Sequence, residues 1–172
     1  SLTGGVSYYL PDTRSNVFNA KLHLIPAPLL TSSPEMAEAL RHESSVMELS
    51  RMTALAQMTV VGIGAMHESA TIFKSGVLNT NDFLYLRMQG AVGDLLSHFF
   101  DKEGRVLQTP IEERLISTPL ETLKTLHNVI GVAAGDSKVD AIRAALRGQY
   151  LDVLITDDRT AEKALAVDEG QD

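Results

Sequence analysis

Short runs of consecutive apolar residues mark four segments of the chain as strands. Each run is rich in Val, Ile or Leu, and each is too short for a helix. The runs cover residues 23–26, 59–65, 129–134 and 152–156. Their apolar positions follow one another instead of alternating, which is typical of parallel strands covered on both faces. We expect the opening residues, 1–5, to be the end of a further strand that runs into a glycine turn.

Helical patterns alternate with these runs. Ser33 precedes Pro34, a pairing that favours a helix start, and Gly148 is typical of a helix end. Asp157 or Asp158 is expected to cap the last helix. The predicted helices cover residues 35–41, 44–58, 136–147 and 158–166. Residues 92–107 instead predict a hairpin that turns at 101–104.

Strands that alternate with helices predict an α/β fold, with a mainly parallel sheet and helices on both faces. The chain has 172 residues, of which 44% are hydrophobic and 22% are charged. These values are ordinary for one soluble globular domain, so we treat residues 1–172 as a single unit.

Charge and composition exclude several classes of function. The formal net charge is −7 and no run of basic residues occurs, so the chain alone should bind nucleic acid poorly. No apolar stretch approaches the roughly 20 residues that cross a membrane. The absence of Cys excludes disulfides and thiol catalysis, and it suits a cytoplasmic protein.

The sequence predicts neither a metal nor a cofactor. The five His are scattered without the spacing of a metal site, and neither a serine-hydrolase elbow nor a P-loop is present. The pair Gly62 and Gly64 starts like a dinucleotide-binding fingerprint, but His67 stands where its third glycine belongs.

Glycines gather where the predicted strands end. Ligands in open α/β sheets bind at the carboxyl ends of the strands, and glycine amides can approach an anion closely. The positions concerned are Gly4, Gly5, Gly64 with Ala65, and Gly135. A phosphate-bearing small molecule would fit such loops. The alternative is that these glycines serve only the tight turns between strand and helix.

Two charged residues stand near this predicted edge. Asp94 follows Gly93 ahead of the hairpin, and a carboxylate there can accept two sugar hydroxyls; the alternative is a turn residue bonded to its own backbone. Lys138 lies in the first turn of its helix, where the helix dipole disfavours a cation. An anionic ligand would explain this lysine, and simple solvation is the alternative.

A set of short motifs resembles the effector domain of SorC-type sugar-sensing transcriptional regulators. The motifs keep their order and spacing over roughly residues 1–166, and together they are specific although each is weak alone. They lie at residues 2–6, 25–29, 60–65, 90–94, 99–104, 130–148 and 154–157.

This resemblance implies a fold similar to sugar-phosphate isomerases and glucosamine-6-phosphate deaminases. It implies a phosphorylated-sugar effector, with Asp94 and Lys138 holding sugar hydroxyls and no catalytic residue. Binding in the family alters the operator affinity of a separate helix-turn-helix domain, and members form homodimers or homotetramers. We expect this chain to lack that DNA-binding domain and also the first βα unit of the effector domain.

Two other functions are compatible with the same residues. A sugar-phosphate isomerase or deaminase would use Asp94 and a His for proton transfer and Lys138 as a Schiff-base former. The third hypothesis is an oligomerisation module whose pocket no longer binds a ligand. No sequence feature requires either alternative.

Overall fold

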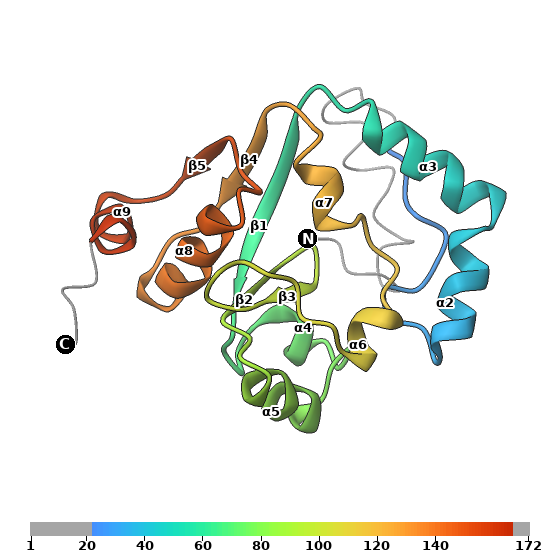
Figure 1. The fold of residues 1–172 in the computed structure, drawn as a ribbon, viewed down its shortest axis with the longest axis horizontal. Helices are drawn as coiled ribbons and strands as arrows, with labels where there is room; N and C mark the ends of the chain where they lie inside the picture. Colours follow the sequence, from blue (N-terminus) through green and yellow to red (C-terminus); the bar gives the residue numbers. More distant parts are fainter. Residues whose placement is uncertain (1–21, 167–172) are drawn as a thin grey trace.

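The computed structural model describes residues 22–166, which form a five-stranded open sheet flanked by helices (Figure 1). The strands are β1 (Thr59–Ala65), β2 (Gly93–Leu95), β3 (His98–Phe100), β4 (Val129–Val132) and β5 (Val153–Ile155). Their order across the sheet is β3-β2-β1-β4-β5. β1 pairs with β4 and β4 with β5 in parallel, whereas β1–β2 and β2–β3 are antiparallel. The predicted α/β class is confirmed, but the sheet is mixed instead of mainly parallel, because the hairpin contributes two antiparallel pairs beside the two parallel ones.

The helices begin and end largely where the sequence predicts. The four helices that the sequence predicted are α2 (Pro34–Arg41), α3 (Ser44–Ala54), α8 (Val139–Arg147) and α9 (Asp158–Leu165). Ser33 caps α2 by accepting a hydrogen bond from the Met36 amide, and Asp157 caps α9. The remaining helices are α4 (Thr71–Lys74), α5 (Thr80–Met88), α6 (Pro110–Glu113) and α7 (Leu120–Leu123), with a 3-10 turn η2 (Asp136–Lys138) before α8.

One predicted strand is absent, and one predicted helix ends early. Residues 23–26 form no strand, and the Ala27 amide instead donates to the Ile25 carbonyl in a bend. Pro26 and Pro28 lack the amide hydrogen that a strand ladder needs. The second helix ends at Ala54 instead of Met58, since the apolar residues that suggested its extension are not buried: Leu55 is 81% exposed.

A hairpin forms within residues 92–107, but its two strands are joined by a turn that was not predicted, and only an isolated bridge, Phe100 with Val106, spans the predicted turn. β2 and β3 are joined at Leu96 and Ser97, both of which have positive φ angles. The predicted turn at 101–104 is also present, closed by the Gly104 amide donating to the Asp101 carbonyl at 2.9 Å. Leu and Ser seldom adopt positive φ, so the residue types gave no signal for the first turn.

One face of the sheet is covered along its whole width. Val61 and Ile63 of β1, with Leu95 and Phe100 of the hairpin, join α7 and α8 in one apolar cluster. The amphipathic face of α8 supplies Ala141, Ile142, Ala144 and Ala145, all fully buried. Burial of this face is the main stabilising term of the fold, because apolar area removed from water contributes about 25 cal/mol per Å².

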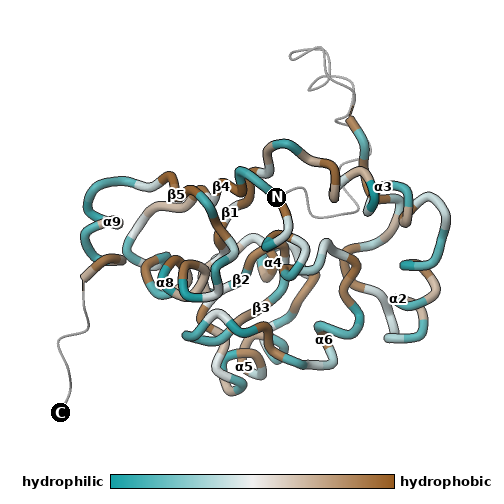
Figure 2. The backbone as a smooth tube through the Cα atoms, turned by 45° about the horizontal axis from the view of Figure 1, so that its top comes forward, coloured by the Kyte–Doolittle hydropathy of each residue, from teal (hydrophilic) through white to brown (hydrophobic). Residues whose placement is uncertain are grey.

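The other face is covered over only half of its width. Behind the hairpin, Phe99 packs with Ile72 of α4, Leu86 of α5 and Ile111 of α6 in a second cluster. Beside it, β1, β4 and β5 present an open face, whose apolar side chains Val60, Val132, Val153 and Ile155 are 43–63% exposed. Figure 2 shows the hydrophobic colour along these three strands. Within residues 22–166, helices therefore cover both faces only at the hairpin.

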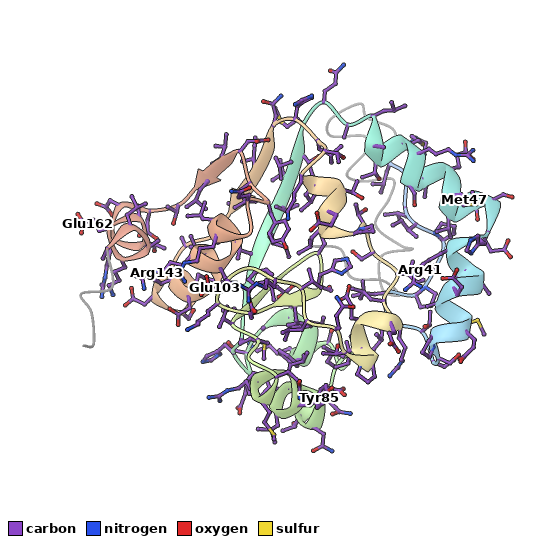
Figure 3. All side chains as sticks on the ribbon, in the orientation of Figure 1. Arg41, Met47, Tyr85, Glu103, Arg143 and Glu162 are labelled. Carbon is purple, nitrogen blue, oxygen red and sulfur yellow. The ribbon has the colours of Figure 1, made fainter. Side chains whose placement is uncertain are left out.

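The segment that carries α2 and α3 is attached through α6. The Thr31 amide donates to the Arg114 carbonyl, and the Ile116 amide donates to the Leu29 carbonyl. Arg41, labelled in Figure 3, donates to the carbonyls of Glu113 and Leu115.

None of the helices in residues 22–166 combines the length and apolarity needed to cross a membrane.

Candidate functional site

Asp94 lies beside the carboxyl end of β1. The register of β2 places it opposite Gly64, and a Cβ atom on Gly64 would overlap the Asp94 carboxylate. The Asp94 carboxylate can therefore occupy this position only because residue 64 has no side chain. Asp94 also stands at the boundary between the two halves of the partly covered face, because Phe99, its partner on β3, belongs to the cluster with α4 and α5.

The carboxylate of Asp94 is held by one amide and is half-buried. The Ser97 amide donates to Oδ2 at 3.1 Å, which links Asp94 to the tight turn of the hairpin. Burial raises the pKa of Asp94 above its ordinary value, and the Ser97 bond and the nearby Lys138 oppose this rise. A carboxylate that has already lost much of its hydration gains more from a polar ligand than an exposed one does.

Lys138 reaches the same place from the other side of β1. It ends the η2 turn, and its Nζ donates to the Ile63 carbonyl at 2.6 Å, next to Gly64. Asp94 and Lys138 therefore converge on the last residues of β1, although they come from elements far apart in the sequence. The sequence predicted that these two residues would share a site, and the fold brings them together.

The remaining predicted residues have different surroundings. Gly93 pairs with Ala65, and a Cβ on Gly93 would overlap both the Ala141 side chain and the Gly64 carbonyl. Its absence lets α8 pack against the hairpin, which is a structural role. Ala65 is buried at the end of β1. A ligand contact for Gly93 or Ala65 stays a prediction. Gly4 and Gly5 lie outside the described residues.

Gly135 has the backbone geometry expected of a ligand loop, but its amide is occupied. Its φ of +110° lies in a region that L side chains rarely adopt. Its N–H donates to Thr160 Oγ1 at 2.8 Å, so this amide already has a partner within the protein. Gly135 therefore shapes the loop before Lys138, and a ligand contact for this residue stays a prediction.

Thr160 lies beside the candidate site but was not predicted as part of it. This side chain is 1% exposed and bonds both Gly135 and the Asp157 carboxylate. A signal was available: Thr160 stands three residues after the capping residue Asp157, the position whose amide a cap side chain bonds. Nothing in the sequence indicated that its hydroxyl would also reach the loop after β4.

Other polar features lie away from Asp94 and Lys138. A cleft of about 530 Å³ near the end of α8 has both acidic and basic lining, including Glu112, Lys124 and Arg147. Neither Asp94 nor Lys138 lines it. Among residues 22–166, no three His, Cys, Asp or Glu side chains gather closely enough to hold a metal ion.

Comparison with known proteins assigns the family. The family model described as "Putative sugar-binding domain" matches residues 7–166. The chain belongs to this family of sugar-binding domains, which is the effector domain of SorC-type regulators. It is 38% identical over 170 residues to the transcriptional regulator LsrR of Klebsiella pneumoniae, covering 97% of this chain and 53% of that protein. LsrR of Escherichia coli K12 is also 38% identical, over 168 residues.

Solved structures agree with this assignment. A DeoR family transcriptional regulator from Listeria monocytogenes has a TM-score of 0.81 and 31% identity, covering 86% of this chain and 60% of that one. The full-length sorbitol operon regulator SorC from Klebsiella pneumoniae has a TM-score of 0.81 at 23% identity, which shows the shared fold. It covers 96% of this chain and 55% of that one.

These relatives define what kind of domain this is. The chain is a sugar-binding domain of this family, and it spans about half the length of the curated relatives, which are named transcriptional regulators. Their names point to a regulator instead of an enzyme, as the sequence predicted.

Proposed function

We propose that this domain binds a phosphorylated sugar at the carboxyl end of β1, where Asp94 and Lys138 hold its hydroxyl groups. The observation that supports this most is the convergence of a half-buried carboxylate and an ammonium group on the same two residues of β1. An ionised carboxylate accepts hydroxyl hydrogens and an ammonium donates to hydroxyl oxygens, so the pair suits a polyol. The phosphate would be held by Gly4, Gly5 and the segment before them.

Binding would act on a larger protein. In our proposal the effector alters the affinity of a separate DNA-binding domain for its operator and shifts the protein, in the cytoplasm, between oligomeric states. The share of the relatives that this domain leaves uncovered, nearly half, supports the existence of that second part. A ligand shifts such an equilibrium only by its differential affinity for the two states.

The open face of the sheet supports the proposal that a βα unit is missing. Parallel strands are almost always covered on both faces, yet Val153 and Ile155 of β5 are about half exposed here. We propose that a further βα unit of the effector domain covers this face in the longer protein. Val153→Lys should then be tolerated by the 172-residue chain and should destabilise the longer protein by several degrees in thermal unfolding. Equal tolerance in both would contradict the proposal.

The first test is thermal unfolding of the chain with a panel of sugar phosphates, each beside its unphosphorylated parent. A compound at about 100 times its dissociation constant should stabilise the fold by roughly 2.7 kcal/mol, a shift of several degrees. A shift with a phosphorylated sugar and none with its parent supports the proposal. No shift with any compound, in the chain and in the longer protein, would count against a sugar-phosphate effector.

The site assignment has its own test. Asp94→Asn and Lys138→Met should each weaken binding about 10- to 100-fold, since hydrogen bonds to charged groups contribute about 1.5–3 kcal/mol. Asp101→Asn and Lys124→Met are matched controls, because both residues lie away from β1: Asp101 caps a turn and Lys124 pairs with Glu121. Titration calorimetry should give unchanged affinity for the controls, and unchanged affinity for Asp94→Asn and Lys138→Met would overturn the assignment.

A further inference from the structure

The loop between β4 and α8 holds Lys138 but has few bonds of its own. The Ala133 amide donates to the Ile155 carbonyl at 3.2 Å, and the Lys138 amide donates to the Gly135 carbonyl at 3.0 Å. Between them, the loop turns at Gly135 with a φ of +110°. The Gly135 amide donates to a group outside the loop, the hydroxyl of Thr160 in α9.

The hydroxyl of Thr160 has its direction fixed by its two partners. It must accept from the Gly135 N–H, so its own hydrogen points to Asp157 Oδ2 at 2.9 Å. The Thr160 amide donates to the other carboxylate oxygen at 2.7 Å, which keeps Asp157 in place. These bonds lower the pKa of Asp157, so its carboxylate is ionised at neutral pH and polarises the whole chain of bonds.

α9 is itself fixed to the rest of the domain. Arg143 of α8 donates to the carbonyls of Lys163 and Ala166 at 2.7 and 2.9 Å, and Figure 3 places it next to α9, where Glu162 is labelled. On the loop side, Asp136 forms ion pairs with Arg159 and Lys163. These ion pairs are exposed and contribute little by themselves. The buried bond of Thr160 is therefore the specific link between α9 and the loop.

We propose that Thr160 is a positioning residue for ligand binding: its hydroxyl holds Gly135 and thereby sets where Lys138 stands beside β1. The inference rests on the proposed sugar-phosphate function. It follows from the short connection, because Lys138 is three residues from Gly135, bonds its carbonyl, and reaches Ile63 through Nζ. A shift of the loop moves the ammonium group relative to Asp94.

The test compares substitutions that remove or keep the hydroxyl. Thr160→Val should weaken binding of the tightest sugar phosphate of the panel about 10-fold, and Thr160→Ser should restore it to within about twofold of wild type, as expected for a charge-linked bond of about 1.4 kcal/mol. Thr109→Val is the matched control: this buried threonine caps α6 through the Glu112 amide, away from β1. It should lower stability and leave the affinity unchanged.

Two readouts separate positioning from a general loss of stability. In a Lys138→Met background, Thr160→Val should have no further effect on affinity, because the group that it positions is gone. Without any ligand, Thr160→Val should shift the NMR signals of the Lys138 side chain and speed hydrogen exchange of the Gly135 amide, while Thr109→Val changes neither. If Thr160→Val does not fold, Thr160→Ala and Thr160→Ser give the same comparison.

The outcomes distinguish this inference from the proposed function. If the wild-type chain and the longer protein bind no sugar phosphate, the proposed function fails, whatever the variants do. If the Lys138 signals are the same in wild type and Thr160→Val, or if Thr160→Val binds as wild type does, the positioning role is wrong. A loss of affinity of the same size in Thr109→Val would also overturn it.

Discussion

The two halves of the sheet are packed differently, and the candidate site lies on the border between them. The hairpin β2–β3 is buried on both faces, by α8 on one and by α4, α5 and α6 on the other. Within residues 22–166, β4 and β5 are covered on one face only. Asp94 belongs to the first half and Lys138 follows β4 in the second. Asp94 therefore belongs to a hairpin that is packed on both faces, whereas Lys138 follows a loop whose Gly135 amide is held by the buried Thr160 hydroxyl.

The largest expected effect contrasts one aromatic side chain from the hairpin with one aliphatic side chain from the open face. Phe100 is fully buried, and Phe100→Ala should cost about 3–5 kcal/mol because it leaves a cavity in the core. Ile155 is 53% exposed, so Ile155→Ala should cost less than about 1 kcal/mol. Urea unfolding measures both, and comparable losses would show that the open face is packed.

A second contrast uses two glycines of neighbouring strands. Gly93→Ala should cost about 1–3 kcal/mol, because the new methyl group would overlap Ala141 and the Gly64 carbonyl. Gly62 lies on the open face, and a methyl group added there would meet no atom within 4 Å. Gly62→Ala should therefore be neutral or stabilise by up to about 1 kcal/mol. Thermal unfolding distinguishes the two, and a loss in Gly62→Ala would contradict the open space.

The smallest effect is on the pH dependence of stability. Burial raises the pKa of Asp94 above 3.8, so the unfolded chain ionises first and stability falls as the pH rises from 3.8 through the folded pKa. Asp94→Asn should remove that fall. The pKa of Asp157 is lowered, so its contribution is present above 3.8 and is lost as the pH falls through the folded pKa.

Asp157→Asn should therefore flatten the acid side of the stability curve, whereas Asp94→Asn should raise the curve at higher pH. Urea unfolding between about pH 3 and pH 7 compares the two variants with wild type. The same direction of change in both would contradict the opposite environments assigned to these carboxylates.

Much of the fold follows from local pattern. The apolar runs at 59–65 and 129–134 and the amphipathic residues of α8 predicted β1, β4 and the helix that covers them, because burial dictates those residue types. The turn at Leu96 and Ser97 did not follow, since tertiary pairing imposes its positive φ angles on residues that rarely adopt them. The apolar runs also predicted that both faces of the sheet are covered. Within residues 22–166, the second face is covered only in part.

The two charged residues of the candidate site could be predicted from the sequence, but the residues that hold them in place were harder to predict. The positions of Asp94 and Lys138 followed from a resemblance and from where strands end. The role of Gly64 as space for a carboxylate, and that of Thr160 as the partner of Gly135, depend on residues that meet only across the sheet. Local patterns carry no information on such pairings.

The mixed pairing of β1 has a consequence for the order of folding. Its antiparallel neighbour is a hairpin whose strands are joined by two residues, so that unit closes rapidly. Its parallel neighbour β4 pairs Thr59 with Val129, a distant contact that must overcome a large loop-closure entropy. We therefore expect Asp94 to be in place early and Lys138 to arrive with the slow step. If the proposed function holds, an incompletely folded chain would not respond to the effector.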